Sequence, residues 1–181
     1  MKKPFLYGVL FLLIACPAYW GEASETPMKV SKTDFNLKSI DGKTTFKLSE
    51  QKGKYVALQF LLKTECPICL AHTRSYSQNA NKHPEVVQVF IKPDTDEEIR
   101  AWADKLKLEK EETQVIYRDP DAQLAEAFGI PNGYQFHGQV VHYPAFILLN
   151  KEGKEVFRYV GKATQDRYDY KKFDELMKTM K

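Results

Sequence analysis

The sequence is poor in cysteine, with three in 181 residues, and two of the three, Cys66 and Cys69, are separated by only two residues. Too few cysteines remain for a disulfide that joins distant segments of the mature chain, so stability must come from a packed core. Apolar residues make up 43% of the chain, enough for a sizeable core in one domain.

The chain also lacks the ligands of a structural zinc site. Such a site needs four, and there is no second Cys-x-x-Cys motif. Leu70, not histidine, follows Cys69, which excludes a c-type haem attachment motif. We therefore expect no metal and no bound cofactor. The histidines also lack zinc-finger spacing; they are His72, His83, His137 and His142.

Neither charge sign is in strong excess. Twenty-seven Lys and Arg residues stand against 24 Asp and Glu, for a formal net charge of +3, and Lys-rich stretches such as 105–110 include glutamate. A nucleic-acid-binding protein is expected to have a clustered basic stripe, so no nucleic-acid partner is predicted.

No apolar run approaches the ~20 residues that span a membrane. The run from Phe5 to Ala15 follows Lys2 and Lys3, which is the pattern of an export signal; a buried N-terminal helix is the alternative, but no amphipathic period is present. Leu13-Ile14-Ala15-Cys16 resembles the lipobox of bacterial lipoproteins, in which Cys16 would be lipidated. Cleavage after Ala18 or Ala23 is the other option.

These features divide the chain into three parts. We expect an export leader over residues 1–23, a linker over 24–32 and a domain over 33–181. The domain would lie in the periplasm or elsewhere outside the cytoplasm, secreted or membrane-anchored, where disulfides persist.

Apolar patterning predicts alternating strands and helices. Asp41-Gly42 is a strong hairpin signal between two short apolar segments. Asp94 or Thr95 can cap a helix, Pro120 can begin one and Gly129 can end it. This order predicts an α/β fold with parallel central strands, flanking helices and a hairpin at one edge. Strands are expected at 55–62, 85–92, 114–117, 144–149 and 155–160, helices at about 67–81, 95–106, 120–128 and 168–180, and a loop at 131–142.

The motif that carries chemistry is Cys66-Pro67-Ile68-Cys69, between a buried strand and a helix start. Unpaired N–H groups and the positive end of the helix dipole favour an anion there, and hence the thiolate of Cys66. Pro67 suits the first turn of a helix because it has no N–H to satisfy. Cys66 is predicted to be the exposed attacking thiol and Cys69 the buried thiol that resolves a mixed disulfide.

Together with later landmarks, this motif resembles the thioredoxin superfamily, and more closely its extracytoplasmic thioredoxin-like and peroxiredoxin-like (redoxin) branch. The resemblance covers about Val30 to Lys181. The later landmarks are Asp119-Pro120-Asp121, Leu124 to Ile130, Pro144 to Gly153, and Tyr159-Val160-Gly161.

The resemblance implies a thioredoxin fold and thiol–disulfide exchange with protein thiols, recycled by an upstream electron donor or acceptor protein. It also implies that Pro144 is a cis-proline that faces the cysteine pair, with Tyr143 and Pro67 beside the same substrate groove. Tyr134, His137 and His142 are weaker candidates for that groove. We expect a monomer.

Two positions depart from the usual thioredoxin pattern. Gln59 stands where thioredoxins carry a buried acid, so it cannot ionise to handle protons for Cys69. Glu65 directly precedes Cys66, and a carboxylate there opposes thiolate formation.

Two other functions stay open. A peroxiredoxin-like peroxidase needs Thr or Ser three residues before its reactive cysteine and Pro four further back, but Lys63 and Gln59 occupy those places relative to Cys66. A thioredoxin-fold copper chaperone would use Cys66, Cys69 and His142, since thiolates and imidazole suit copper. Chaperones of that kind usually space their cysteines by three residues rather than two.

Overall fold

The computed structural model describes residues 31–63, 66–106, 114–136, 139–163 and 165–180. The predicted leader with Cys16, most of the linker, Glu65 and His137 lie outside these residues.

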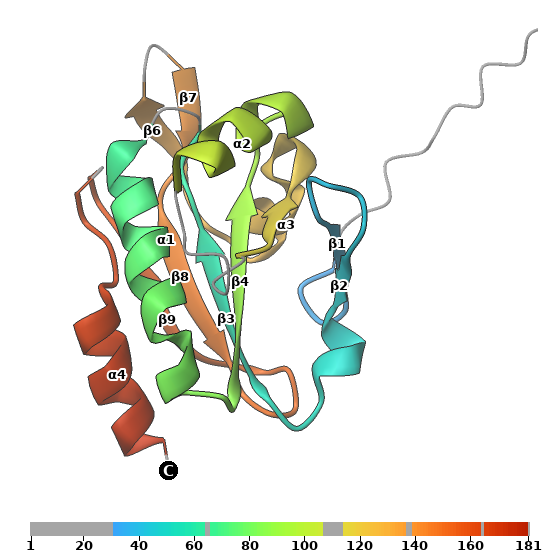
Figure 1. The fold of residues 1–181 in the computed structure, drawn as a ribbon, viewed down its shortest axis with the longest axis vertical. Coiled ribbons are helices and arrows are strands. Elements are labelled where there is room, and N and C mark those ends of the chain that lie inside the picture. The colour runs from blue at the N-terminus through green and yellow to red at the C-terminus, as the bar shows by residue number, and fades with distance from the viewer. Residues whose placement is uncertain (1–30, 64–65, 107–113, 137–138, 164, 181) are drawn as a thin grey trace, which may run out of the picture.

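A five-stranded mixed sheet forms the centre of the domain, in the order β5-β4-β3-β8-β9 (Figure 1). β3, β4 and β5 run parallel, and β8 and β9 form the antiparallel hairpin at one edge, as predicted. The strands are β3 (Tyr55–Phe60), β4 (Val86–Lys92), β5 (Ile116–Arg118), β8 (Ala145–Leu149) and β9 (Glu155–Val160).

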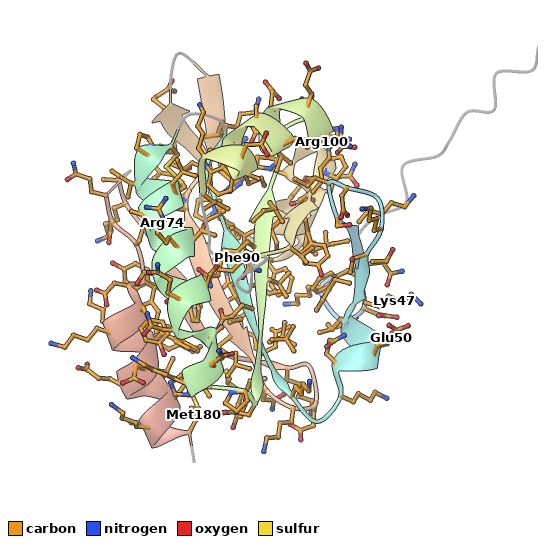
Figure 2. The ribbon with its side chains drawn as sticks, viewed as in Figure 1. Lys47, Glu50, Arg74, Phe90, Arg100 and Met180 are labelled. Carbon is orange, nitrogen blue, oxygen red and sulfur yellow. A yellow bond between two sulfur atoms is a disulfide. The ribbon has the colours of Figure 1, made fainter. Side chains whose placement is uncertain are left out.

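Helices and a small hairpin cover the two faces of this sheet. On one face, the buried residues of the sheet pack against those of α1 (Pro67–Asn79), α2 (Asp96–Ala103) and α4 (Tyr170–Thr179). On the other, they pack against α3 (Gln123–Ala127) and the hairpin of β1 (Asn36–Lys38) and β2 (Thr45–Lys47). Phe90 of β4 lies at the centre of the molecule, on the α1 side (Figure 2).

The alternation of side chains along β3 supplies both cores. Val56, Leu58 and Phe60 face the α3 side, whereas Ala57 faces the α1 side. Because both faces are buried, the strand reads as a nearly continuous apolar run. It ends at Phe60 rather than at the predicted Leu62, so Leu61 and Leu62 lead out of the sheet toward the cysteine motif.

Local signals fix several element ends. Asp41-Gly42 lies in the turn between β1 and β2, with Gly42 at φ +70°. Thr95 caps α2 through a capping box with Glu98, which selects Thr95 over Asp94. Arg100 of α2 donates to the carbonyl of Ile40 at 2.6 Å and so joins the helix to the loop after β1 (Figure 2).

The helix predicted from Pro120 starts later than expected. Pro120–Ala122 form a single 3₁₀ turn, and Asp121 and Ala122 both have φ of 55°. The buried carboxylate of Asp119 accepts from the N–H groups of Leu124 and Ala125 at 2.8 and 3.0 Å. This side chain satisfies two N–H groups of the first turn of α3, which have no carbonyl partner within the helix.

The loop predicted over residues 131–142 is wrong. It contains an antiparallel hairpin of β6 (Asn132–Phe136) and β7 (Gln139–His142). A shift in register between Asn132 and Tyr134 leaves room for Gly133, whose φ is +116°. The prediction took Asn132-Gly133 as a loop signal, but the glycine instead serves an irregularity inside a strand.

Candidate active site

The cysteine pair lies at the N-terminus of α1, directly after the segment that leaves β3. Cys66 is the N-cap, and its Sγ accepts a hydrogen bond from the backbone N–H of Cys69 at 3.1 Å. Pro67 occupies the first helical turn, as predicted. Cys66 and Cys69 form a disulfide with a Cα–Cα distance of 5.1 Å. The sulfur of Cys66 therefore sits where helix N–H groups favour negative charge.

Both cysteines are fully buried, with 0% of either residue exposed. The prediction that Cys66 is an exposed attacking thiol is therefore wrong for the disulfide form. The cause is packing, because both cysteines belong to the same apolar cluster as Leu62 and Val141. A partner can reach the sulfurs only if a side chain that covers them moves.

Arg167 covers the sulfurs from the segment between β9 and α4. Its Nη2 lies 3.7 Å from Sγ of Cys66 and 3.5 Å from Sγ of Cys69. Sequence reasoning missed this residue, because it lies 101 positions after Cys66 in a polar segment with no motif of its own. Only the docking of this segment beside the start of α1 brings the charge to the sulfurs.

Pro144 directly precedes β8, and its peptide bond is not cis, since the residues that the structure describes contain no cis peptide bond. The expected cis-proline is thus corrected to trans, the isomer that X–Pro bonds ordinarily favour by about 0.5–1 kcal/mol. The Pro144 carbonyl accepts from the N–H of Gly161 at 2.8 Å. Pro144 and Arg167 line one small cavity, so the proline still lies near the cover of the disulfide.

Gly161 allows this close packing. A Cβ at this position would come within 2.0 Å of the backbone oxygen of Asp166 and 3.0 Å of Cγ of Pro144. Only glycine therefore fits between Pro144 and the segment that carries Arg167. Tyr143, the neighbour of Pro144, is half-buried and packs against the ring of Tyr134, with centroids 5.4 Å apart.

A neutral polar pair lies beneath the site. Gln59 of β3 is buried, and its Oε1 lies 2.6 Å from Nε2 of His72 on α1. Burial, with a further contribution from Arg167, lowers the pKa of His72 to about 3. His72 is thus uncharged at neutral pH and donates from Nε2 to the amide oxygen. Neither member of this pair is ionised, as expected from Gln59 in the place of the buried acid of thioredoxins.

The buried His72 predicts a pH dependence of stability. Its pKa is below the ordinary value of 6.5, so the unfolded chain binds more protons as the pH falls below 6.5. Its stabilising contribution is full above pH 6.5 and is lost as the pH falls toward 3. We expect the stability advantage of wild type over His72→Gln to shrink by about 1.4 kcal/mol per pH unit between pH 6 and about 4.5. Urea unfolding at several pH values measures it, and a constant difference would contradict the assignment.

A buried ion pair supports the segment before the cysteines. Lys92, at the end of β4, donates to the carbonyl of Leu62 at 2.5 Å, and its Nζ lies 3.3 Å from Oδ2 of Asp94. It also lies 4.6 Å from the ring centre of Trp102. Burial lowers the pKa of Lys92 to about 8, against the opposing effect of Asp94. The ammonium thereby links the ends of β3 and β4 to α2.

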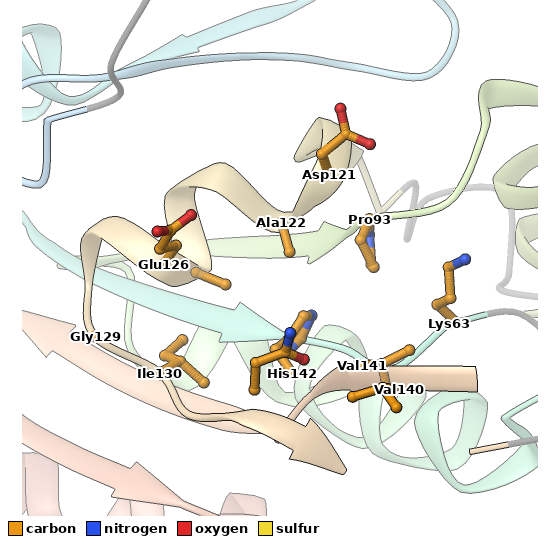
Figure 3. A pocket seen from close by; sticks show the side chains of 12 residues that line it. Lys63, Pro93, Asp121, Ala122, Glu126, Gly129, Ile130, Val140, Val141 and His142 are labelled. Carbon is orange, nitrogen blue, oxygen red and sulfur yellow. The ribbon is translucent and has the colours of Figure 1, made fainter. Parts of the chain in front are cut away.

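A larger open pocket of about 610 Å³ lies between α3 and β7 (Figure 3). Lys63, three residues before Cys66, and His142, two before Pro144, are in its lining. His142 is nearly fully buried, and its Nδ1 donates to the carbonyl of Tyr143 at 2.7 Å. Burial lowers the pKa of His142, so its imidazole is neutral.

The three residues of the copper hypothesis are not gathered into one site. Within the described ranges, no three His, Cys, Asp or Glu side chains are grouped closely enough to hold a metal ion. Cys66 and Cys69 are bonded to each other, and His142 is turned toward the carbonyl of Tyr143. Across the same ranges, no helix has the length and apolar character to cross a membrane.

The sheet order, the flanking helices and a Cys-x-x-Cys disulfide at the start of α1 define a redoxin of the thioredoxin superfamily, which is an oxidoreductase class. The sequence profile of the AhpC/TSA family matches residues 30–156, most of the chain. The chain belongs to the AhpC/TSA family. A search of curated proteins returned no match.

Solved structures of a thioredoxin, of a disulfide oxidoreductase and of PrxQ resemble this fold. The pneumococcal exposed lipoprotein thioredoxin Etrx1 from Streptococcus pneumoniae strain TIGR4 has 25% identity and a TM-score of 0.58, over 81% of this chain and 97% of the other. A secreted disulfide oxidoreductase from Mycobacterium tuberculosis has 22% identity and a TM-score of 0.55, over 80% and 92%. A mutant of PrxQ from Xylella fastidiosa has 15% identity and a TM-score of 0.65, over 81% and 87%. The last two likenesses concern the fold alone.

Proposed function

We propose that this protein is an extracytoplasmic thiol–disulfide oxidoreductase that exchanges the Cys66–Cys69 disulfide with protein thiols. The observation that carries the proposal is the disulfide itself, whose N-cap sulfur accepts the N–H of Cys69 at 3.1 Å. A leaving thiolate at this position is stabilised by the helix N-terminus, which makes the bond easier to reduce.

Exchange proceeds in two displacements. A partner thiolate attacks Sγ of Cys66, the Cys66–Cys69 bond breaks, and its electron pair leaves on Cys69. A second partner thiolate then attacks the partner's own sulfur in the mixed disulfide and releases Cys66. The partner dithiol loses two electrons and becomes a disulfide, while the protein gains two electrons. The proton that the partner's second thiol loses as it attacks ends on Cys69. An upstream donor or acceptor protein resets the pair.

The location outside the cytoplasm rests on the pattern of residues 1–23 and on the persistence of disulfides in oxidising compartments. The similarity to an exposed lipoprotein thioredoxin supports a membrane tether through Cys16. Radiolabelled palmitate incorporated into wild type, but not into Cys16→Ser, would bear this out. Release of unlabelled wild-type protein from cells would instead favour cleavage after Ala18 or Ala23.

Peroxide reduction is the second candidate, favoured by membership of the AhpC/TSA family and by the fold of PrxQ. Against it, Lys63 and Gln59 occupy the positions where the peroxidase pattern has Thr or Ser and Pro.

One pair of assays on the wild-type protein separates the two activities. We expect the protein to equilibrate its disulfide with glutathione and to catalyse dithiothreitol-driven reduction of insulin. We also expect the reduced protein to consume hydrogen peroxide no faster than an ordinary free thiol. Protein alkylated at both cysteines is the blank. Rapid peroxide turnover without insulin reduction would overturn the proposal in favour of a peroxidase.

A further inference from the structure

Arg167 is a partly buried charged side chain. No carboxylate lies within 4.0 Å of its guanidinium among the residues that the structure describes, and its buried Nε has no hydrogen-bond partner there. Nη1 makes only long contacts of 3.4 Å to the carbonyls of Ala163 and Asp166. Since a partly buried cation is costly unless it is paired, an anion that forms beside this guanidinium would be stabilised.

The Nη2 atom of the guanidinium faces the two sulfurs. Nη2 lies 3.5 and 3.7 Å from the disulfide, which carries no charge in the form described here. Reduction converts one of these sulfurs to a thiolate and so places an anion at the position already faced by the cation. Burial lowers the pKa of Arg167 to about 10, which leaves the guanidinium charged at neutral pH.

We propose, on the basis of the exchange function above, that Arg167 is a catalytic residue that covers the Cys66–Cys69 disulfide and binds the thiolate released when that disulfide is reduced. The guanidinium serves both displacements of the reaction. It first faces the electron pair that leaves on Cys69, and after release of the partner it faces the thiolate of Cys66. The backbone N–H of Cys69 is the second donor to Cys66.

The position of Arg167 favours one direction of the redox equilibrium of the Cys66–Cys69 couple. A cation that binds the thiolate stabilises the reduced protein over the oxidised one, and a protein whose reduced form is stabilised is the stronger oxidant. Arg167 therefore shifts the Cys66–Cys69 couple toward oxidation of partner thiols. Its effect on the Cys66 thiolate is opposite in sign to the one expected from the sequence for the carboxylate of Glu65, which precedes Cys66.

The test compares Arg167→Met, which keeps the length of the side chain without its charge, with Arg167→Lys. Lys162→Met is the matched control, because it removes a positive charge from an exposed position of the same segment. Two quantities are measured: the equilibrium constant with glutathione, and the pH at which the reduced protein gains thiolate absorbance at 240 nm.

We expect Arg167→Met to disfavour the reduced form at least about tenfold, a potential ~30 mV more negative by the two-electron conversion. Thiolate absorbance should appear about one pH unit higher, or more. Arg167→Lys should recover part of both shifts, and Lys162→Met should match wild type. Equal values in wild type, Arg167→Met and Lys162→Met would overturn the role of Arg167 while the exchange function stands. No equilibration of wild type with glutathione would instead overturn the proposed function.

Discussion

Cys66→Ser is expected to lower the rate of insulin reduction at least about 1,000-fold, because loss of a nucleophile removes the step on which all later ones depend. The hydroxyl that replaces the thiol cannot form the mixed disulfide. The substitution is close in size, and the disulfide closes a loop with a sequence separation of only three, so its loss leaves the chain entropy of the unfolded state little changed. Circular dichroism should show the fold intact.

Cys69→Ser is expected to fail at a later step. When the reduced protein attacks a partner disulfide, the reverse of the exchange written above, Cys66 still forms a mixed disulfide. Because Cys69 is then absent and cannot resolve it, covalent complexes with partner proteins accumulate. Non-reducing electrophoresis would detect them, and reduction would release them. Cys16→Ser, a matched exchange away from the domain, should retain full activity. Trapped complexes in Cys66→Ser but not in Cys69→Ser would contradict the assigned order of the two cysteines.

Asp94→Ala is expected to lower the free energy of unfolding by about 3–5 kcal/mol, because it leaves the ammonium of Lys92 buried without its counter-ion. Both side chains of this pair are 0% exposed, and the charge lies beside the carbonyl of Leu62. The double variant Lys92→Met with Asp94→Leu should be much closer to wild type, since apolar replacements of a buried pair are often well tolerated. Urea unfolding at pH 7 measures both.

The exposed pair of Lys47 and Glu50 is the control for this prediction (Figure 2). Its side chains are about half exposed, so Glu50→Ala should cost less than about 1 kcal/mol. Equal effects of Glu50→Ala and Asp94→Ala would show that the buried pair contributes nothing particular.

The buried pair of Lys92 and Asp94 also predicts how the free energy of unfolding depends on pH. The pKa of Lys92 is lowered to about 8 from an ordinary 10.5, so the unfolded chain binds more protons between these values. Wild-type stability should therefore rise as the pH increases from 8 to about 9.5, below the pKa of about 10 at which tyrosines titrate in the unfolded chain. Lys92→Met should abolish this rise.

Apolar patterning was sufficient for the sheet. The run that begins at Tyr55 and the run at Val86–Lys92 are buried on both faces. Strands of this kind are nearly continuous apolar segments and can be recognised in the sequence. Pro120 and Asn132-Gly133 were harder. A proline that opens a 3₁₀ turn and a glycine inside a strand irregularity give the same local signals as a helix start and a loop.

The residues of the candidate site that are neighbours in the sequence were predicted. Those that distant segments bring to the site were missed. Cys66, Pro67 and Cys69 carry their geometry in adjacent positions, so their place at a helix start follows from the sequence. Arg167 and the burial of Cys66 depend on which distant segment packs over the helix start, which no local pattern records. The trans bond before Pro144 also differs from what the resemblance implied.

The chain order of the site has a consequence for biogenesis. Arg167 contacts sulfurs that precede it by 101 and 98 positions, and synthesis runs from the N-terminus. The cysteines therefore leave the ribosome long before the guanidinium does, and a nascent chain passes through a stage in which its sulfurs meet thiols or oxidants with no shield. Synthesis and docking of the segment that carries Arg167 end that stage, so a part of the polypeptide made later governs access to one made earlier.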